Sequence, residues 1–325
     1  MSPASSVFVA AAARLHFGVL DLRGSLGRRF GGLGAAIPSP SLLLEAEPAP
    51  QVITAGPDAA RVDAFARRFL THHGVSRGAR LTVHRAIPPH SGLGSGTQLG
   101  LSVARALAEL YRLPTDAPSL ARAVSRGRRS AIGTWSFAYG GFIVEGGHRP
   151  QEVTVAPLLG RYEVPESWRY VVAVPPGEPG LSGEAESAAF ERLPAPPERE
   201  PERVAHLVLM QLLPSLVEGD LIGFGIALTA IQRLTGAWFS ASQGGIFAPG
   251  VGPELIARMS EWGAAGVGQS SWGPAVYGLV EGAERGRTLA ERVAAALAGQ
   301  GQVFEGGFAR HGARVKWGGP PANPD

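Results

Sequence analysis

A glycine-rich segment that runs directly into a helical pattern constrains this chain more than any other feature. Residues 88–98 read PPHSGLGSGTQ, and apolar residues then recur at helical spacing at 99, 103, 107 and 110, which predicts a helix over 97–111. Alternate glycines free backbone N–H groups, and a helix start adds more, together with the positive end of its dipole. The pattern therefore predicts a phosphate or diphosphate site at Gly92, Gly94, Ser95, Gly96 and Thr97. An ordinary capped helix after a turn is the alternative.

Composition is typical of a globular enzyme of about two domains. The chain has 325 residues, 45% of them hydrophobic and 18% charged. Its 30 basic residues include one lysine, Lys316, so nearly all are arginines, which can hold two oxygens of an anion at once. A GC-rich genome would produce the same bias. The arginines are scattered among acidic residues, which argues against nucleic-acid binding.

Several other classes of protein are disfavoured. The chain has no cysteine, which excludes disulfides and thiolate chemistry. The apolar runs Val7–Ala13 and Leu221–Ile231 are too short to span a membrane, and no basic segment precedes the first as in a signal peptide. We therefore expect a cytoplasmic protein that does not interact with membranes.

The order of predicted elements indicates an α+β fold in two halves. Strand and helix patterns alternate in the first half, and a proline-rich stretch over 150–165 precedes a mainly helical second half. We predict an N-terminal domain over 1–155, a C-terminal domain over 156–317 and a loose tail over 318–325. The elements that matter below are a strand over 7–13, loops over 22–34, 127–141 and 266–274, strands over 42–47 and 51–54, and helices over 59–72 and 220–234.

Common catalytic motifs are missing from the sequence. There is no G-x-x-x-x-G-K-[ST] loop, no G-x-G-x-x-G after the first strand and no G-x-S-x-G elbow. The eight histidines lack the spacing of zinc ligands.

The motif that does occur resembles the GHMP kinase superfamily, whose phosphate loop reads P-x-x-x-G-L-G-S-S. Residues 89–96 fit this loop, and residues 266–273 occupy the place of the late glycine-rich loop. The resemblance implies a two-domain fold, with an N-terminal half like ribosomal protein S5 domain 2 and a ferredoxin-like C-terminal half. Where the kinases carry a catalytic aspartate, this chain has Gly133, so the base that helps to activate a hydroxyl is missing.

This sequence resembles one branch of the superfamily, which is not a kinase, more closely than it resembles the kinases. That branch is the beta-ribofuranosylaminobenzene 5'-phosphate synthase family of methanopterin biosynthesis. The resemblance extends from residue 14 to residue 274, and its most distinctive blocks are RLHFG at 14–18, GSLGRRFGG at 24–32, RGRRS at 126–130, GLSG at 180–183 and GVGQSSWGP at 266–274.

This resemblance implies a decarboxylating pentosyltransferase. Its substrates would be 5-phosphoribosyl diphosphate and 4-aminobenzoate or 4-hydroxybenzoate, and carbon dioxide and diphosphate would leave. Such chemistry calls for concentrated oxyanion binding with Mg²⁺ and a carboxylate near the sugar. No organic cofactor is expected, and the resemblance implies a homodimer.

Within that reaction, each candidate residue has a predicted role. Asp21 is the expected catalytic carboxylate, as a Mg²⁺ ligand or as a stabiliser of positive charge on the sugar. His16 is expected to handle a proton of the aromatic substrate or to bind its carboxylate. The anion clamps are predicted to be Arg28, Arg128 and Arg129, with Arg126 beside them.

The remaining predictions concern the aromatic acid and the metal. Gln269, Ser270, Ser271 and Trp272 offer neutral donors and an indole face for a benzoate ring. Glu184 is a second candidate metal ligand, although a solvated surface position is its ordinary role. Two other functions stay open at this stage: an ATP-dependent small-molecule kinase and a non-catalytic protein that binds a phosphometabolite.

Overall fold

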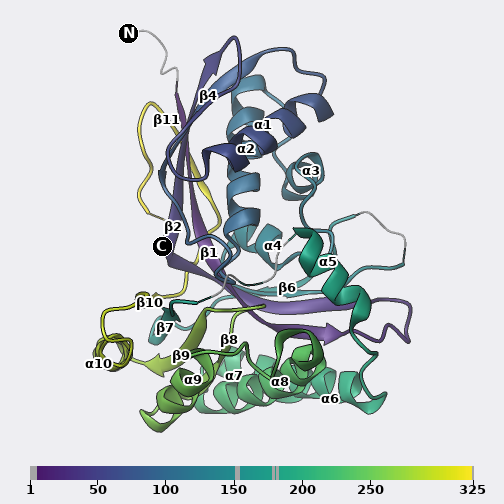
Figure 1. Cartoon of the computed structure of the whole chain (residues 1–325), viewed down its shortest axis with the longest axis vertical. Helices are drawn as coiled ribbons and strands as arrows, with labels where there is room; N and C mark the ends of the chain where they lie inside the picture. Colours follow the sequence, from purple (N-terminus) through teal and green to yellow (C-terminus); the bar gives the residue numbers. More distant parts are fainter. Residues whose placement is uncertain (1–5, 151–153, 178–179, 181–182, 324–325) are drawn as a thin grey trace.

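The computed structural model describes residues 6–150, 154–177, 180 and 183–323. Its strands form two sheets (Figure 1). The seven-stranded sheet has the path β11-β1-β2-β4-β3, with β5 paired to β2 and β6 to β5, and the four-stranded sheet has the order β10-β7-β9-β8. The strands are β1 Val7–Asp21, β2 Phe30–Ala49, β3 Ile53–Ala55, β4 Gly78–Arg85, β5 Phe142–Glu145, β6 Leu158–Tyr162, β7 Trp168–Val174, β8 Gly266–Gln269, β9 Val276–Glu281, β10 Gln302–Gly307 and β11 Arg314–Trp317.

The helices form two groups. In Figure 1, α1 to α4 lie on one side of β1 and β2, and α6 to α9 lie at the other end of the molecule, beyond the smaller sheet. The helices are α1 Ala59–His72, α2 Ser95–Tyr111, α3 Ala117–Ala123, α4 Ile132–Tyr139, α5 Gly183–Arg192, α6 Arg199–Leu207, a π-helical turn Val208–Leu212, α7 Leu213–Glu218, α8 Leu221–Gln243, α9 Gly252–Glu261 and α10 Ala283–Ala296.

The strand β1 is the axis of the larger sheet. Nearly every residue from Val7 to Val19 is buried, because helices or other strands cover both faces, and such strands lose the usual apolar–polar alternation. Its pairing with β2 shifts between His16 and Gly18. A shift of this kind bends a strand and changes the direction of nearby side chains, and this one occurs where β1 reaches the cavity described below.

Several predicted loops are wrong because glycine and proline conceal regular structure. Residues 30–34, predicted as the end of a loop, and the strand predicted over 42–47 belong to one strand, β2, whose Gly31, Gly32 and Gly34 obscure the pattern. The loop predicted over 127–141 contains α4, whose buried and exposed faces do not differ in hydrophobicity. The loop predicted over 266–274 begins with β8.

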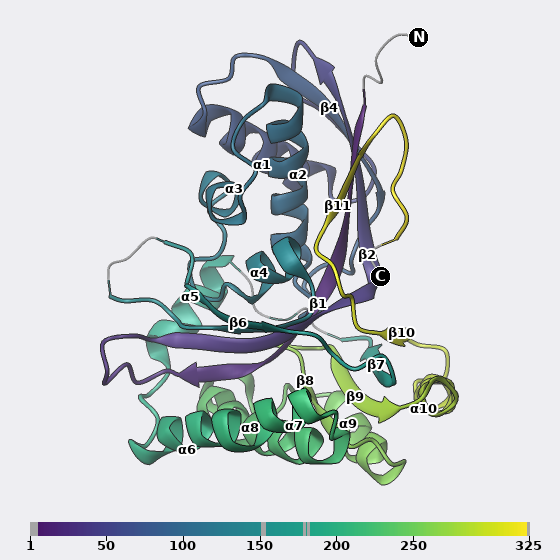
Figure 2. The ribbon, with the colours of Figure 1, turned by 180° about the vertical axis from the view of Figure 1, so that it is seen from behind.

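The larger sheet contains strands from both sides of the predicted domain boundary at residue 155. β6 pairs with β5 and β11 pairs with β1, so two strands beyond residue 155 complete the larger sheet. Figure 2 shows β11 lying along β1. The predicted tail also contacts this sheet, since Gly318 donates its backbone N–H to Ser6 O at 2.9 Å.

Helix α8 extends to Gln243, nine residues beyond its predicted end. It is long and apolar enough to meet the criteria for a membrane span, but 56% of its most apolar stretch is buried within the fold. Core helices of soluble proteins commonly meet the same criteria. Ile231 and Gln232 are among the residues it buries.

Candidate active site

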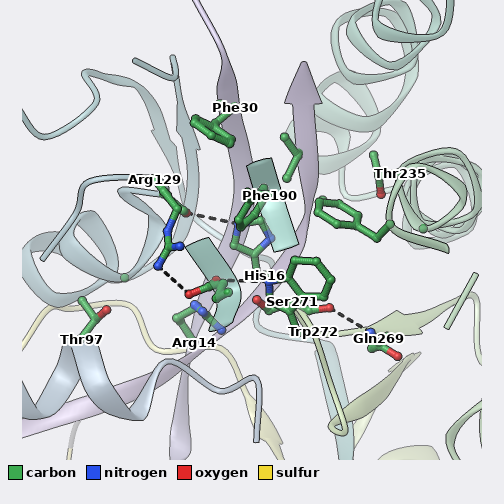
Figure 3. Close-up of a pocket in the computed structure, with 18 of the residues that line it drawn as sticks. Arg14, His16, Phe30, Thr97, Arg129, Phe190, Thr235, Gln269, Ser271 and Trp272 are labelled. Carbon is green, nitrogen blue, oxygen red and sulfur yellow. Dashed lines mark hydrogen bonds and ion pairs between the residues drawn. The ribbon is translucent and has the colours of Figure 1, made fainter. Parts of the chain in front are cut away.

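A cavity of about 410 Å³ lies where β1, the loop before α4, helices α5 and α8, and the loop after β8 meet (Figure 3). Its lining divides by chemistry. One side, which we call the arginine wall, contains Arg14, Thr97, Arg126, Arg128, Arg129 and Ser130. The other, the aromatic wall, contains Phe30, Phe190, Phe239, Phe247 and Trp272.

Arg14 connects β1 to the glycine-rich loop. Its backbone N–H donates to Leu93 O at 3.1 Å, and its guanidinium donates to Gly92 O. Burial lowers its pKa to about 10, with Glu186 opposing the shift and Arg126 adding to it. A cation held so close to other cations is typical of an anion site, because a bound anion offsets the cost.

The side chain of Arg126, a residue that follows α3, reaches the first turn of helix α2. Its Nη2 donates to Thr97 Oγ1 at 3.0 Å, and its pKa is lowered mainly by burial. The helix begins after Gly94 with no side-chain cap and no acidic residue in its first turn. A helix N-terminus with an adjacent guanidinium has the donors and the positive charge that can bind phosphate oxygens.

The glycines of the predicted phosphate loop are packed against the protein itself. A Cβ on Gly92 would lie 2.2 Å from Ser270 O, and one on Gly94 would lie 2.9 Å from the Arg14 side chain. Of the predicted set Gly92 to Thr97, only Thr97 lines the cavity. The loop therefore holds Arg14 and the late loop in position, and the arginine wall supplies most of the charge.

Arg128 and Arg129 both line the cavity. Arg128 is exposed and makes no hydrogen bond or ion pair with any described residue. Arg129 donates to Glu186 Oε2 at 2.8 Å and lies over the Phe190 ring, 5.6 Å from its centroid. These two arginines are thus brought to the site as predicted, one open to solvent and one paired.

The aromatic wall consists of rings that meet edge to face. Trp272 lies 5.4 Å from Phe190 and 4.9 Å from Phe239, and Phe30 lies 5.4 Å from Phe190, measured between ring centroids. The indole N–H of Trp272 donates to Glu186 Oε1 at 3.2 Å. Rings held in this way leave flat faces for an aromatic ligand.

The other residues of the late loop are occupied by protein partners. Gln269 accepts the Ala248 N–H at 2.7 Å and donates to Ser271 O at 3.0 Å. Ser270 is fully buried, and its hydroxyl donates to Gly92 O at 2.7 Å. Ser271 lines the cavity with a left-handed backbone. The structure thus brings this loop to the site, but Gln269 and Ser270 mainly hold its shape.

His16 is buried beside Ser130. Its Nε2 lies 3.2 Å from Ser130 Oγ, and its backbone N–H donates to Ser270 Oγ at 3.0 Å. Burial and the charge of Arg14 lower its pKa to about 3. The imidazole is therefore neutral at physiological pH, so it can exchange hydrogen bonds with a ligand but cannot pair with a carboxylate as a cation.

Glu145 lies behind the arginine wall. Its side chain is fully buried and accepts the N–H groups of Gly147 at 2.7 Å and Ala131 at 3.3 Å. Burial raises its pKa to about 7, although both hydrogen bonds oppose the shift. Glu145 supports the segment that carries Arg128 and Arg129, through the Ala131 N–H, and no motif marks it in the sequence.

Asp21 and Arg28 lie outside the cavity lining. Asp21 Oδ1 accepts the backbone N–H groups of Arg23 at 2.6 Å and Gly24 at 2.9 Å, which is a turn-forming arrangement. Arg28 donates to Gly147 O at 3.0 Å. The contacts of Asp21 are those of the turn between β1 and β2, whereas Arg28 links this turn to the residues that follow β5.

The side chains of the described residues form no metal cage of their own. Within the described ranges, no group of three or more His, Asp or Glu side chains lies close enough together to hold an ion. The side chain of Glu184, in α5, falls outside the described residues.

Gly133 lines the cavity at the start of α4. A Cβ there would lie 2.9 Å from the Thr97 side chain, so the space that a larger residue would need is filled. A residue with a side chain at this position would require Thr97 to shift.

Sequence reasoning missed several residues of the cavity. Glu186, Phe190 and Phe239 come from α5 and α8, and no motif marks them. Arg14 carried a signal, since it interrupts an apolar run in a strand whose neighbours are buried. A charged residue in such a place usually has a function or a buried partner.

Comparison with known proteins identifies relatives of the whole chain. The GHMP kinases N terminal domain family matches residues 60–141, and the GHMP kinases C terminal family matches residues 212–299. A beta-ribofuranosylphenol 5'-phosphate synthase of Methanothermobacter thermautotrophicus is 34% identical over 322 residues, covering 93% of this chain and 96% of that protein. Its namesake from Archaeoglobus fulgidus is 34% identical over 282 residues, covering 83% and 86%.

Solved structures agree on the fold. Homoserine kinase from Cytophaga hutchinsonii superposes with a TM-score of 0.68 at 16% sequence identity, covering 96% of this chain and 98% of that one. The predicted α+β fold of the GHMP kinase type is therefore confirmed. At this level of identity the likeness concerns architecture alone.

Proposed function

The chain belongs to the beta-ribofuranosylphenol 5'-phosphate synthase family within the GHMP kinase superfamily, and from that premise we propose that it is a decarboxylating phosphoribosyltransferase. It would condense 5-phosphoribosyl diphosphate with 4-hydroxybenzoate or 4-aminobenzoate in tetrahydromethanopterin biosynthesis. The relatives' name contains a phenol, which corresponds to the hydroxybenzoate.

The observation that carries this proposal is the pairing of two unlike walls in one cavity. The arginine wall suits a sugar that bears phosphate and diphosphate, and the aromatic wall suits a benzoate ring. A small-molecule kinase would have use for the first wall, but Gly133 occupies the place of its catalytic aspartate.

The reaction balances without a proton. The C1–O bond to diphosphate breaks and its electron pair leaves with diphosphate. The ring carbon that bears the carboxylate then bonds to C1, and the C–C bond to the carboxylate breaks to release carbon dioxide, which returns its electron pair to the ring. These reaction steps need stabilisation of charge rather than a strong base. A neutral His16 and the glycine at position 133 agree with this requirement.

Within the proposal, Arg14, Arg126 and Arg128 bind phosphate oxygens, Arg129 binds a further oxygen, and Trp272 covers the benzoate ring. Mg²⁺ would arrive with the diphosphate, because the ion is commonly held by substrate phosphates and one or two carboxylates. The described residues offer no cage of their own, so no step above depends on the ion.

The deciding experiment supplies the purified protein with 5-phosphoribosyl diphosphate, Mg²⁺ and carboxyl-labelled 4-hydroxybenzoate or 4-aminobenzoate. We expect labelled carbon dioxide and diphosphate in equal amounts. ADP formed from ATP and a panel of alcohols, without carbon dioxide release, would instead support a kinase. Binding of the sugar diphosphate with no turnover of either acid would support a non-catalytic binding protein.

We also propose that the protein is a cytoplasmic homodimer. The π-helical turn, α7 and the start of α8 expose a group of apolar side chains on neighbouring elements: Leu209, Met210, Val217, Ile222 and Ile226. Exposed apolar groups of this kind mark interfaces. Ile226→Glu should yield a monomer in light scattering, whereas Leu26→Glu, on the exposed hairpin, should leave the assembly unchanged. A wild-type monomer would contradict the proposal.

A further inference from the structure

Glu186 is the only carboxylate among the described residues that line the cavity. It faces a lining with four arginines, Arg14, Arg126, Arg128 and Arg129, and its charge opposes the lowering of the pKa of both Arg14 and Arg126. The side chain is 23% exposed, so a ligand can reach it. An acid in a site built for anions weakens the binding of those anions, and its presence therefore needs an explanation.

The position of Glu186 provides one. Oε2 accepts from Arg129 at 2.8 Å, and Oε1 accepts from the Trp272 indole at 3.2 Å. The carboxylate thus touches the arginine wall with one oxygen and the aromatic wall with the other. Figure 3 shows Arg129, Phe190 and Trp272 lining the same cavity.

The boundary between the walls is also where the proposed reaction must take place. The new bond joins C1 of the sugar, which carries the diphosphate, to a carbon of the aromatic ring. If phosphates occupy the arginine wall and the ring occupies the aromatic wall, C1 lies where the two meet. We propose that Glu186 is the catalytic carboxylate that stabilises positive charge on C1 as diphosphate leaves; this inference rests on the proposed function.

The chemistry uses Glu186 as a charge and not as a base. When the C1–O bond breaks, its electron pair goes to diphosphate and C1 and the ring oxygen share a positive charge. A carboxylate fixed nearby lowers the energy of this state. No proton is transferred in this step. Arg129, the ion-pair partner of Glu186, then also pairs with substrate oxygens.

This role makes an unusual prediction, because the charge has opposite effects on two steps. Glu186 repels the anionic substrate in the ground state and attracts the positive charge that develops in the transition state. Glu186→Gln should therefore bind 5-phosphoribosyl diphosphate at least as tightly as wild type in calorimetry, while kcat falls by about 100-fold. A residue that only positions Arg129 would show the reverse, with weaker binding and a smaller change in kcat.

The matched control is Glu191→Gln, which makes the same change on an exposed turn of the same helix and should leave both quantities unchanged. Glu186→Asp keeps the charge and should retain more turnover than Glu186→Gln, and it serves as the test if the glutamine variant does not fold. In an Arg129→Met background, Glu186→Gln should still lower kcat by at least about 10-fold.

The failure of this inference is distinct from the failure of the proposed function. A wild-type protein that releases no carbon dioxide from either acid refutes the function. An active wild type whose Glu186→Gln variant keeps kcat within threefold, or binds the sugar diphosphate more than tenfold more weakly, overturns the role of Glu186 alone. The same conclusion follows if Glu186→Gln has no effect once Arg129 is replaced.

Discussion

The two walls of the cavity are built on opposite physical principles. The aromatic wall is self-supporting, because Phe190, Phe239 and Trp272 pack on one another edge to face and would do so without a ligand. The arginine wall holds cations that burial and mutual repulsion disfavour, as the lowered pKa values of Arg14 and Arg126 indicate. The aromatic wall is therefore stable by its own packing. The arginine wall is stabilised by an anion that offsets its positive charge.

This difference separates stability from affinity. Removing a ring from the aromatic wall should weaken both the fold and ligand binding, since the same contacts serve both. Removing a cation from the arginine wall should weaken binding while the fold keeps its stability or gains some, because a charge that was costly to bury is gone. Four measurements test this contrast.

The largest effect is expected behind the arginine wall, at Glu145. Its pKa is raised to about 7 in the folded protein, against an ordinary value near 4.5, so the native state binds the proton more tightly. The stability that this provides is full below about pH 4.5 and is lost as the pH rises to about 7. Relative to Glu145→Gln, which cannot titrate, wild type should lose about 3 kcal/mol of unfolding free energy over this range.

Denaturant unfolding at several pH values measures this difference. Since the two proteins share all other titrating groups, the gap between their curves isolates Glu145. If the unfolding free energies of the two proteins change in parallel from pH 4.5 to pH 8, ionisation of Glu145 does not destabilise the fold. The contrast between the walls would then rest on the arginines alone.

The second measurement removes a cation. Arg126→Met should weaken binding of 5-phosphoribosyl diphosphate by about 1.5–3 kcal/mol, or roughly 10- to 150-fold, the usual range for a hydrogen bond to a charged group. Its unfolding free energy should equal or exceed that of wild type. Arg122→Met, on the exposed face of α3, is the control. If Arg126→Met lowers the unfolding free energy but leaves the affinity for 5-phosphoribosyl diphosphate unchanged, Arg126 stabilises the fold and does not bind the substrate.

The third measurement removes a ring. Phe239→Leu keeps an apolar side chain but loses two edge-to-face contacts, which should raise the KM for the aromatic acid by roughly 2- to 12-fold and lower stability by about 1 kcal/mol. The KM for the sugar diphosphate should not change. Phe304→Leu in β10, also partly buried, applies the same change away from the cavity. If Phe239→Leu raises the KM for the aromatic acid and the KM for the sugar diphosphate equally, the two walls do not each bind a different substrate.

The smallest effect is expected at Asp21, outside both walls. Asp21→Asn keeps an oxygen that can accept the N–H groups of Arg23 and Gly24, so stability should stay within about 0.5 kcal/mol of wild type. Turnover should persist. A folded Asp21→Asn protein without turnover would return the catalytic carboxylate to Asp21 and count against Glu186.

The fold was largely predictable because most of its elements carry strong periodicity. The helix over 59–72 matches α1, and the helix expected over 97–111 begins two residues earlier at Ser95. The first part of β2 and the helix α4 were missed for a common reason, since both form where packing against neighbours outweighs local preference. Tertiary contacts decided those segments.

The site was predictable only where one stretch of sequence carries several of its residues. Arg128, Arg129, Ser271 and Trp272 fall in distinctive blocks and do line the cavity. Arg28 lies in an equally distinctive block and Asp21 shortly before it, yet neither lines the cavity: Asp21 binds the backbone of its own turn and Arg28 binds Gly147 O. The aromatic wall draws single residues from α5, α8 and β2, and no local pattern records that these will meet.

The pairing of β11 with β1 has a consequence for how the chain is made. β1 leaves the ribosome long before its partner on one side, Arg314–Trp317, because the two segments lie far apart in the chain. Until then the edge of β1 from Val7 to Ala10 remains open, and an open strand edge can pair with another chain. A nascent chain must therefore protect this edge until residues 314–317 have been made, and removal of these residues would expose it permanently.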